Sequence, residues 1–209
     1  MWDKYILEIK NFIPKGLSEH MINKFESDDR KVDGVYKYDD INGEEIIMKK
    51  YNTELGISNY PNEWGIITKE LDFYMNDIFT KYIEKLKMDF DISDREHIYF
   101  QEINDILNGF YNITHFGYNL HRIKEGDKYS WHHDGELHQP LFIQIIFYLN
   151  NLEEHQGGCT EFLNGRKVKP ECGKVLVYPC SWLFPHCGNE VKMGSKYICT
   201  TTVILNKKE

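Results

Sequence analysis

The chain has 209 residues, of which 41% are hydrophobic and 14% aromatic, a composition typical of a folded globular protein. Its formal net charge of −8 argues against a surface built to bind the nucleic-acid backbone, which requires clustered positive charge. The longest apolar run, residues 141–149, is interrupted by Gln144 and is too short for a membrane span. We therefore expect a single domain over residues 1–209 and no membrane partner.

The first part of the chain, residues 1–97, is predicted to form a mixed helical support region. Residues 5–9 alternate apolar and polar side chains, which predicts a short strand. Apolar side chains then recur at helical spacing over residues 17–25. Residues 35–38 and 45–48 are expected to pair as strands around a turn rich in Asp, Asn and Gly.

The clearest helix is predicted over residues 64–86. Its apolar side chains fall three or four residues apart, which gives one hydrophobic face. We interpret this face as support for a sheet rather than as a docking site for a partner. A polar loop is expected over residues 89–96.

The second part, residues 98–209, is expected to be mainly β. Turn signals such as Gly157-Gly158 and Asn164-Gly165 separate short apolar runs. Many short strands at close spacing favour a sandwich or a barrel. The candidate strands are residues 112–123, 129–133, 142–149, 160–163, 174–178 and 197–205.

The composition of the first residues and the number and spacing of the cysteines are the two features that bear on the cellular location. Residues 1–20 contain no apolar core of signal-peptide length. The five cysteines are an odd number and include no Cys-x-x-Cys pair, so reduced thiols are expected rather than disulfides. We expect a cytoplasmic protein.

A metal site is predicted from three residues. Side chains two apart on a strand share a face, so His132 and Asp134 should point the same way while His133 points away. His186 follows 52 residues later, far enough for the chain to return across a barrel. Two histidines and one carboxylate that leave coordination positions open are typical of non-haem Fe(II) oxygenases. The alternative is an exposed polar strand end, because the chain has nine histidines and one His-x-Asp alone is weak evidence.

A series of segments resembles the prolyl-4-hydroxylase-like branch of the 2-oxoglutarate- and Fe(II)-dependent dioxygenases. The resemblance covers roughly residues 115–205, and the N-terminal half matches only in general layout. The segment Pro170-x-x-Gly173-x-x-x-x-Tyr178 corresponds to a family strand that ends in phenylalanine. The other matching segments are Gly126-x-x-Tyr129-x-x-His132-x-Asp134, Phe147-Tyr148-Leu149-Asn150, Gly157-Gly158-Cys159-Thr160-Glu161-Phe162, and His186 with Lys196 ten residues later.

The resemblance implies a fold, a reaction and a set of roles. The fold would be α+β but mainly β: a double-stranded β-helix, or jelly-roll, with helices packed on one sheet. His132, Asp134 and His186 would bind Fe(II), while Lys196 and Tyr148 would bind the distal carboxylate of 2-oxoglutarate. The enzyme would use O2, with ascorbate as an additional reductant, and hydroxylate a C–H bond while forming succinate and CO2. No protein acid, base or nucleophile beyond the metal site is expected to be catalytic.

Physical chemistry supports the role of Lys196, because a dianion in a partly dry barrel needs a fixed cation. The alternatives are a surface lysine at position 196 and an ordinary core aromatic at position 148. Tyr129, three residues before His132, would line the substrate pocket or its rim.

Three positions depart from the family pattern and bear on the substrate. Ile123 stands where a tyrosine is common, and Leu141 and Gln144 replace an arginine and a threonine. Because that arginine is associated with substrate contact, prolyl specificity is open. Gln144 could replace the threonine as a contact to 2-oxoglutarate. Arg122 could point into the substrate pocket or make a structural ion pair instead.

The leading hypothesis is a hydroxylase of a peptide or protein residue, with proline the first to try. The alternatives are a nucleobase or small-molecule hydroxylase or demethylase of the same superfamily, and a cupin-like metal-binding module without oxygenase activity. A nucleic-acid substrate is disfavoured by Lys196, where such relatives usually carry arginine, and by the negative charge. The oligomeric state is not predicted.

Overall fold

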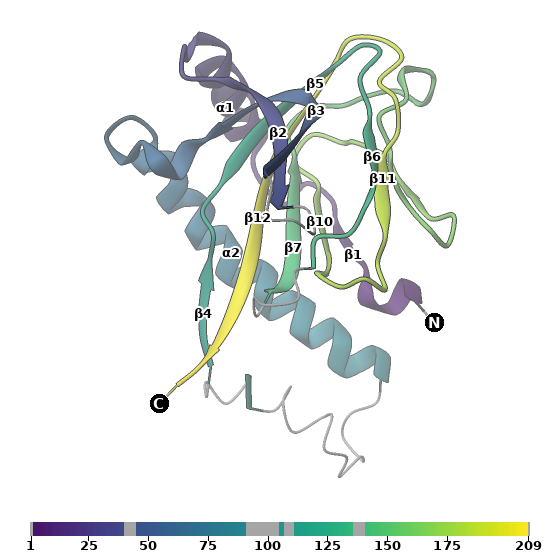
Figure 1. The fold of residues 1–209 in the computed structure, drawn as a ribbon. Coiled ribbons are helices and arrows are strands. Elements are labelled where there is room, and N and C mark those ends of the chain that lie inside the picture. The colour runs from purple at the N-terminus through teal and green to yellow at the C-terminus, as the bar shows by residue number, and fades with distance from the viewer. Residues whose placement is uncertain (1, 40–44, 91–104, 107–110, 136–140, 209) are drawn as a thin grey trace.

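The computed structural model describes residues 2–39, 45–90, 105–106, 111–135 and 141–208. Two antiparallel sheets face one another, and the helices lie against the outer face of the larger sheet (Figure 1). The described helices are α1 (Lys15–Ser27) and α2 (Pro61–Phe90), with short 3-10 turns at Trp2–Tyr5, Ile57–Asn59 and Glu154–Gln156. None of them is both long and apolar enough to cross a membrane.

The strands confirm most of the predicted runs. They are β1 (Leu7–Ile9), β2 (Val32–Asp39), β3 (Glu45–Gly56), β4 (Tyr111–His115), β5 (Asn119–Lys124), β6 (Tyr129–His132), β7 (Leu141–Tyr148), β8 (Thr160–Phe162), β9 (Lys167–Val168), β10 (Val175–Pro179), β11 (His186–Gly188) and β12 (Ser195–Lys207). The predicted turn at residues 40–43 and most of the loop at residues 89–96 lie outside the described residues. Helix α2 confirms the long amphipathic helix and extends it by three residues at its start and four at its end.

The larger sheet has the strand order β1-β10-β7-β12-β5-β3-β2, and β4 also pairs with β12. Strands β1, β2 and β3 come from the region expected to be a mixed helical support, in which short strands were predicted. The sequence did not indicate that β1 pairs with β10 and that β3 pairs with β5 of the core. The proposed boundary between residues 97 and 98 lies outside the described residues.

Strand β7 shows why the sequence forms two layers. Its side chains alternate between the two faces of the sheet. Ile143, Ile145 and Phe147 belong to the core that the helices complete, together with Trp64 and Leu71 of α2. Ile146 and Tyr148 instead belong to a second core between the two sheets. A strand buried on both faces has no polar face, so its sequence is almost continuously apolar.

The smaller sheet has the order β6-β11-β8-β9. Strand β11 was not predicted, since it has only three residues and no alternating pattern. Its pairing with β6 places His186 opposite His132. Two facing antiparallel sheets with helices on one outer face are the jelly-roll architecture that the sequence resemblance implied.

The single strand predicted over residues 112–123 is wrong in one respect. The structure divides it into β4 and β5, which both pair with β12. Gly117 lies between them with a φ of 87°, a left-handed conformation that favours glycine. The break lets β5 continue the sheet toward β3.

Candidate metal centre

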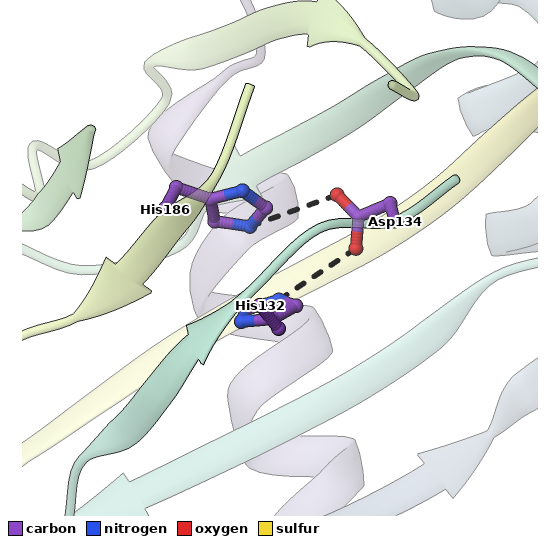
Figure 2. A group of neighbouring side chains, drawn as sticks. All are labelled: His132, Asp134 and His186. Atoms are coloured by element: carbon purple, nitrogen blue, oxygen red, sulfur yellow. Dashed lines mark ion pairs between the residues drawn. The ribbon is translucent and has the colours of Figure 1, made fainter. Parts of the chain in front are cut away.

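The three predicted ligands meet at the end of β6. His132 is the last residue of β6, and Asp134 follows two residues later, where its carboxylate faces both imidazoles and directs one oxygen toward His132 and the other toward His186 (Figure 2). The His132 Nε2 to Asp134 Oδ1 distance is 3.7 Å, and the His186 Nε2 to Asp134 Oδ2 distance is 3.6 Å. One possible ligand atom from each residue lies within 4.8 Å of those from the other two. His133 is not part of this cluster, but it lines the same cavity, so the prediction that it points away from the site is wrong.

Backbone carbonyls fix the tautomers of both histidines. His132 Nδ1 lies 2.8 Å from the carbonyl oxygen of Ser130, and His186 Nδ1 lies 3.1 Å from that of Phe184. Because a carbonyl oxygen can only accept, each Nδ1 must donate its hydrogen, which leaves both Nε2 lone pairs facing Asp134. Burial also lowers the pKa of His186, so its imidazole stays neutral. Two neutral imidazoles and a carboxylate that leave other positions open are a donor set that fits Fe(II).

A fourth side chain at the cluster was not singled out by sequence analysis. The hydroxyl of Tyr178, on β10 of the larger sheet, donates to Asp134 Oδ2 at 2.9 Å and lies 3.0 Å from His186 Nε2. Burial raises the pKa of Tyr178, and the charge of Asp134 adds to this, so the phenol keeps its proton. The one available signal was tyrosine at a position where the resembling family segment has phenylalanine.

Lys196 is buried in the same cavity. It is only 4% exposed, and its ammonium lies 5.5 Å from the centre of the Tyr148 ring. No ion pair between described residues involves it. The other buried lysine, Lys174, instead has carboxylate oxygens of Glu8 and Glu171 each at 3.3 Å. Burial accordingly lowers the pKa of Lys196 to about 8, as expected for a cation without an anion beside it.

Tyr148 and Gln144 lie on the same face of β7 but at different depths. The Tyr148 hydroxyl is 2.7 Å from Thr160 Oγ1, close to Lys196. Gln144 lies four residues away, about 13 Å along the strand, and accepts from Thr202 Oγ1 at 2.5 Å. Both Gln144 and Lys196 line the cavity, but Gln144 does not share the position that Tyr148 and Lys196 occupy.

The cavity between the two sheets has a volume of about 340 Å³. The triad, Lys196 and Thr160 all line it, so the metal-binding candidates and the buried cation share one space. Tyr129 also lines it, and its ring centre lies 4.3 Å from that of His132, as expected for a pocket residue. His121 and Asn119 of β5 contribute to the wall opposite the small sheet.

The pocket position considered for Arg122 is not the one in the structure. Along β5, Asn119, His121 and Ile123 line the cavity, so Arg122 lies on the opposite face. Its Nη1 is 2.6 Å from Glu26 Oε2 of α1. The structural ion pair, which was the alternative interpretation, is the arrangement found.

Comparison with known proteins agrees with this geometry. Residues 118–203 match the model of the 2OG-Fe(II) oxygenase superfamily. This segment begins just before β5 and ends within β12, so it contains the triad, Tyr148 and Lys196. No curated protein sequence matches the chain closely enough to count as a relative.

Several solved structures have the same fold. A prolyl hydroxylase from Trichoplax adhaerens in complex with a hypoxia inducible factor peptide has a TM-score of 0.62 and 14% identity, covering 96% of this chain and 84% of that one. A collagen prolyl hydroxylase of Paramecium Bursaria Chlorella virus-1 in complex with 2OG has a TM-score of 0.56 and 16% identity, covering 97% of both chains. A Pseudomonas putida prolyl-4-hydroxylase has a TM-score of 0.55 and 11% identity, covering 95% and 91%.

The family match argues against the cupin-like module without oxygenase activity, which was the remaining alternative of a different class. The chain shares its fold with the prolyl hydroxylases, and the donor set of the triad suits Fe(II). We conclude that residues 118–203, which contain the triad and Lys196, are similar to the 2OG-Fe(II) oxygenase superfamily, whose members use Fe(II), 2-oxoglutarate and O2.

Proposed function

We propose that the enzyme hydroxylates a C–H bond of a peptide or protein residue, with proline the first candidate, and that His132, Asp134 and His186 hold its Fe(II). The proposal depends on one observation: the possible metal ligands and a buried cation line the same cavity. The ligands are the three donors whose lone pairs face a common point. The cation is the buried ammonium of Lys196, which has no ion-pair partner among the described residues.

Each side chain would have a distinct task. When bound, Fe(II) and 2-oxoglutarate supply the oxidising chemistry that converts a C–H bond to C–OH while O2 and the keto acid yield succinate and CO2. Lys196 would pair with the distal carboxylate of 2-oxoglutarate, since an anion there offsets the cost of burying the cation. Tyr148 would donate a hydrogen bond to the same carboxylate and turn away from Thr160 to do so. The apolar walls at Ile146 and Ile198 would limit access of water.

The peptide substrate is supported by the neighbours and by the surroundings of the triad. One neighbour is described in complex with a peptide fragment, and another as a collagen prolyl hydroxylase. Trp131 and Trp182 are exposed and lie outside the lining of the cavity. Exposed tryptophans would contact the parts of an extended peptide that remain outside the cavity.

A peptide panel tests the substrate. Peptides that differ only at one central residue (proline, lysine, asparagine or leucine) would be incubated with enzyme, Fe(II), 2-oxoglutarate and O2, and analysed by mass spectrometry. We expect the proline peptide to gain one oxygen atom and to accelerate succinate release. An enzyme that forms succinate but oxidises a nucleoside, or a free small molecule, and no peptide would contradict the proposal.

A pair of neighbouring variants tests the ligand set. Asp134→Ala should abolish retention of Fe(II), because it removes the anionic donor. His133→Ala changes the adjacent residue, which lies outside the cluster, and serves as the matched control. Metal content would be measured after gel filtration under argon. Equal losses in the two variants would mean that residues 132, 134 and 186 are not the ligands.

We also propose a cytoplasmic location, which the chemistry of the cysteines supports. All five are free thiols in the structure, as is usual for proteins in a reducing compartment.

A further inference from the structure

The Tyr178 hydroxyl connects the triad to the larger sheet. His132 and His186 lie on paired strands, whereas Asp134 lies just beyond the end of β6 in a segment without regular structure. The Tyr178 ring, only 1% exposed, packs against both Phe162 and His186, whose ring centres lie 5.2 Å and 4.8 Å from its own. Its hydroxyl therefore has a fixed position from which it reaches Asp134 Oδ2.

The hydroxyl has one hydrogen and two neighbours that could accept it. One is the Asp134 carboxylate, at 2.9 Å, and the other is the His186 Nε2 lone pair, at 3.0 Å. An ionised carboxylate is the stronger acceptor. A metal on His186 would use the Nε2 lone pair, so the carboxylate is the acceptor that remains in the loaded protein.

We propose that Tyr178 is a positioning residue for the metal, which holds Asp134 by Oδ2 and leaves Oδ1 to bind the ion. The inference rests on the ligand set proposed above and adds a residue that acts through one of those ligands. Outer-shell partners that orient ligands typically contribute about 10- to 100-fold to metal affinity. The same hydrogen bond restricts the carboxylate to one ligating oxygen, which keeps a coordination position open for other groups.

The test uses Co(II) alone, without 2-oxoglutarate or substrate. Metal-free wild type, Tyr178→Phe and Tyr82→Phe would be titrated with Co(II) under argon by calorimetry and visible absorption. Tyr82→Phe is the matched control, because it removes a hydroxyl from an equally buried tyrosine whose partner is the backbone carbonyl of Tyr5 instead of a ligand. Circular dichroism would show that each variant is folded before titration.

We expect Tyr178→Phe to weaken Co(II) binding by about 10- to 100-fold while Tyr82→Phe leaves it unchanged. At saturating metal, the Co(II) absorption of Tyr178→Phe should also differ from wild type, because an untethered carboxylate can bind through both oxygens. A purely structural loss would not change that spectrum.

Three results would overturn the inference. Unchanged affinity in Tyr178→Phe would show that the hydrogen bond does not orient Asp134. Tighter binding would show that the hydroxyl competes with the metal for His186. A tyrosinate-to-metal charge-transfer band in ferric wild type, absent from Tyr178→Phe, would show direct ligation. Failure of the ligand set itself is distinguishable, because Asp134→Ala would then bind Co(II) as wild type does.

Discussion

Two buried lysines of this chain differ in what surrounds them. Lys174, 2% exposed, has two carboxylates and a backbone carbonyl as partners. Lys196, 4% exposed, faces the cavity with the Tyr148 ring beside it and no carboxylate among the described residues. Burying a charge without a partner is unfavourable, and a protein that keeps such a group uses it for function more often than for stability. Lys196 therefore represents a cost to folding that binding of an anion would offset.

Replacing Lys196 by methionine should separate stability from function. The pKa of Lys196 falls from 10.5 to about 8, and since each unit corresponds to about 1.4 kcal/mol, Lys196→Met should stabilise the ligand-free protein at pH 7 by up to about 3 kcal/mol. The same change should weaken 2-oxoglutarate binding by at least about 30-fold, the loss expected for one partner of a buried charge pair. Urea unfolding and calorimetric titration measure the two effects. A destabilised variant with unchanged keto acid affinity would contradict both.

The affinity for 2-oxoglutarate should depend on pH through Lys196. Its folded-state pKa lies below the unfolded one, so stability of the ligand-free protein should rise with pH between about 8 and 10.5. Binding of the anion needs the protonated lysine, so affinity should fall about tenfold per pH unit above about pH 8. Lys196→Arg keeps a cation that does not titrate and should remove this dependence. A wild-type affinity that is constant from pH 7 to pH 10 would count against the pairing.

At the scale of residues, spacing in the sequence identifies which side chains the fold brings together. His132 and Asp134 meet His186 as expected, although Asp134 lies beyond the end of β6 and not on the strand itself. Lys196, ten residues after His186, lines the same cavity. Tyr178 was missed because a tyrosine in an apolar strand gives no local sign that its hydroxyl will meet a carboxylate 44 residues away. Arg122 could not be assigned because either face of β5 can be the inner one until the sheet is assembled.

At the scale of elements, the break between β4 and β5 determines the direction in which β5, one wall of the cavity, runs. Gly117 takes a φ of 87°, and a Cβ there would lie 2.8 Å from the side chain of Ser58. Ser58 Oγ accepts a hydrogen bond from the Tyr118 backbone, so it cannot move away without losing that contact. The turn therefore depends on glycine for two reasons, the backbone conformation and the space.

Two glycine variants separate these reasons. Gly126 has a φ of 82°, but no atom lies within 4 Å of the place that an alanine Cβ would take, so Gly126→Ala should cost only the backbone strain, of order 1–3 kcal/mol. Gly117→Ala should cost about 1 kcal/mol more, because the Ser58 hydrogen bond is also disturbed. Chemical denaturation of both variants measures the difference. Equal losses would show that the contact with Ser58 does not matter.

The elements also show where sequence reasoning ends. Helix α2 and strand β7 have strong periodic or continuous apolar patterns, and both were predicted within a few residues. Strand β11 has three residues and gives no pattern, yet it holds His186. The entry of β1 into the main sheet depends on pairing with β10, more than 160 residues later, which local pattern cannot indicate.

At the scale of the whole molecule, the site lies between the two sheets. The triad comes from the small sheet and its strand end, whereas Lys196, Tyr148 and Tyr178 come from the large one. A ligand that contacts both the triad and Lys196 should therefore stabilise the packing of the small sheet against the large one.

This arrangement predicts how binding stabilises the protein. A ligand that binds only the folded state adds about 2.7 kcal/mol at a concentration of about 100 times its Kd. Metal should raise the melting temperature of wild type, and 2-oxoglutarate should raise it further. Lys196→Met should keep the first increment and lose the second, and Asp134→Ala should lose both. The prediction fails if 2-oxoglutarate stabilises Lys196→Met as much as wild type.

The most direct test of the account asks whether the triad and Lys196 bind the same two ligands together. Wild type would be titrated with 2-oxoglutarate in the presence of Fe(II) under argon, while visible absorption is recorded. We predict a metal-to-ligand charge-transfer band that saturates in wild type, needs far more keto acid in Lys196→Met, and is absent in Asp134→Ala. A band of equal affinity in wild type and Lys196→Met, or one that persists without Asp134, would contradict the proposed site.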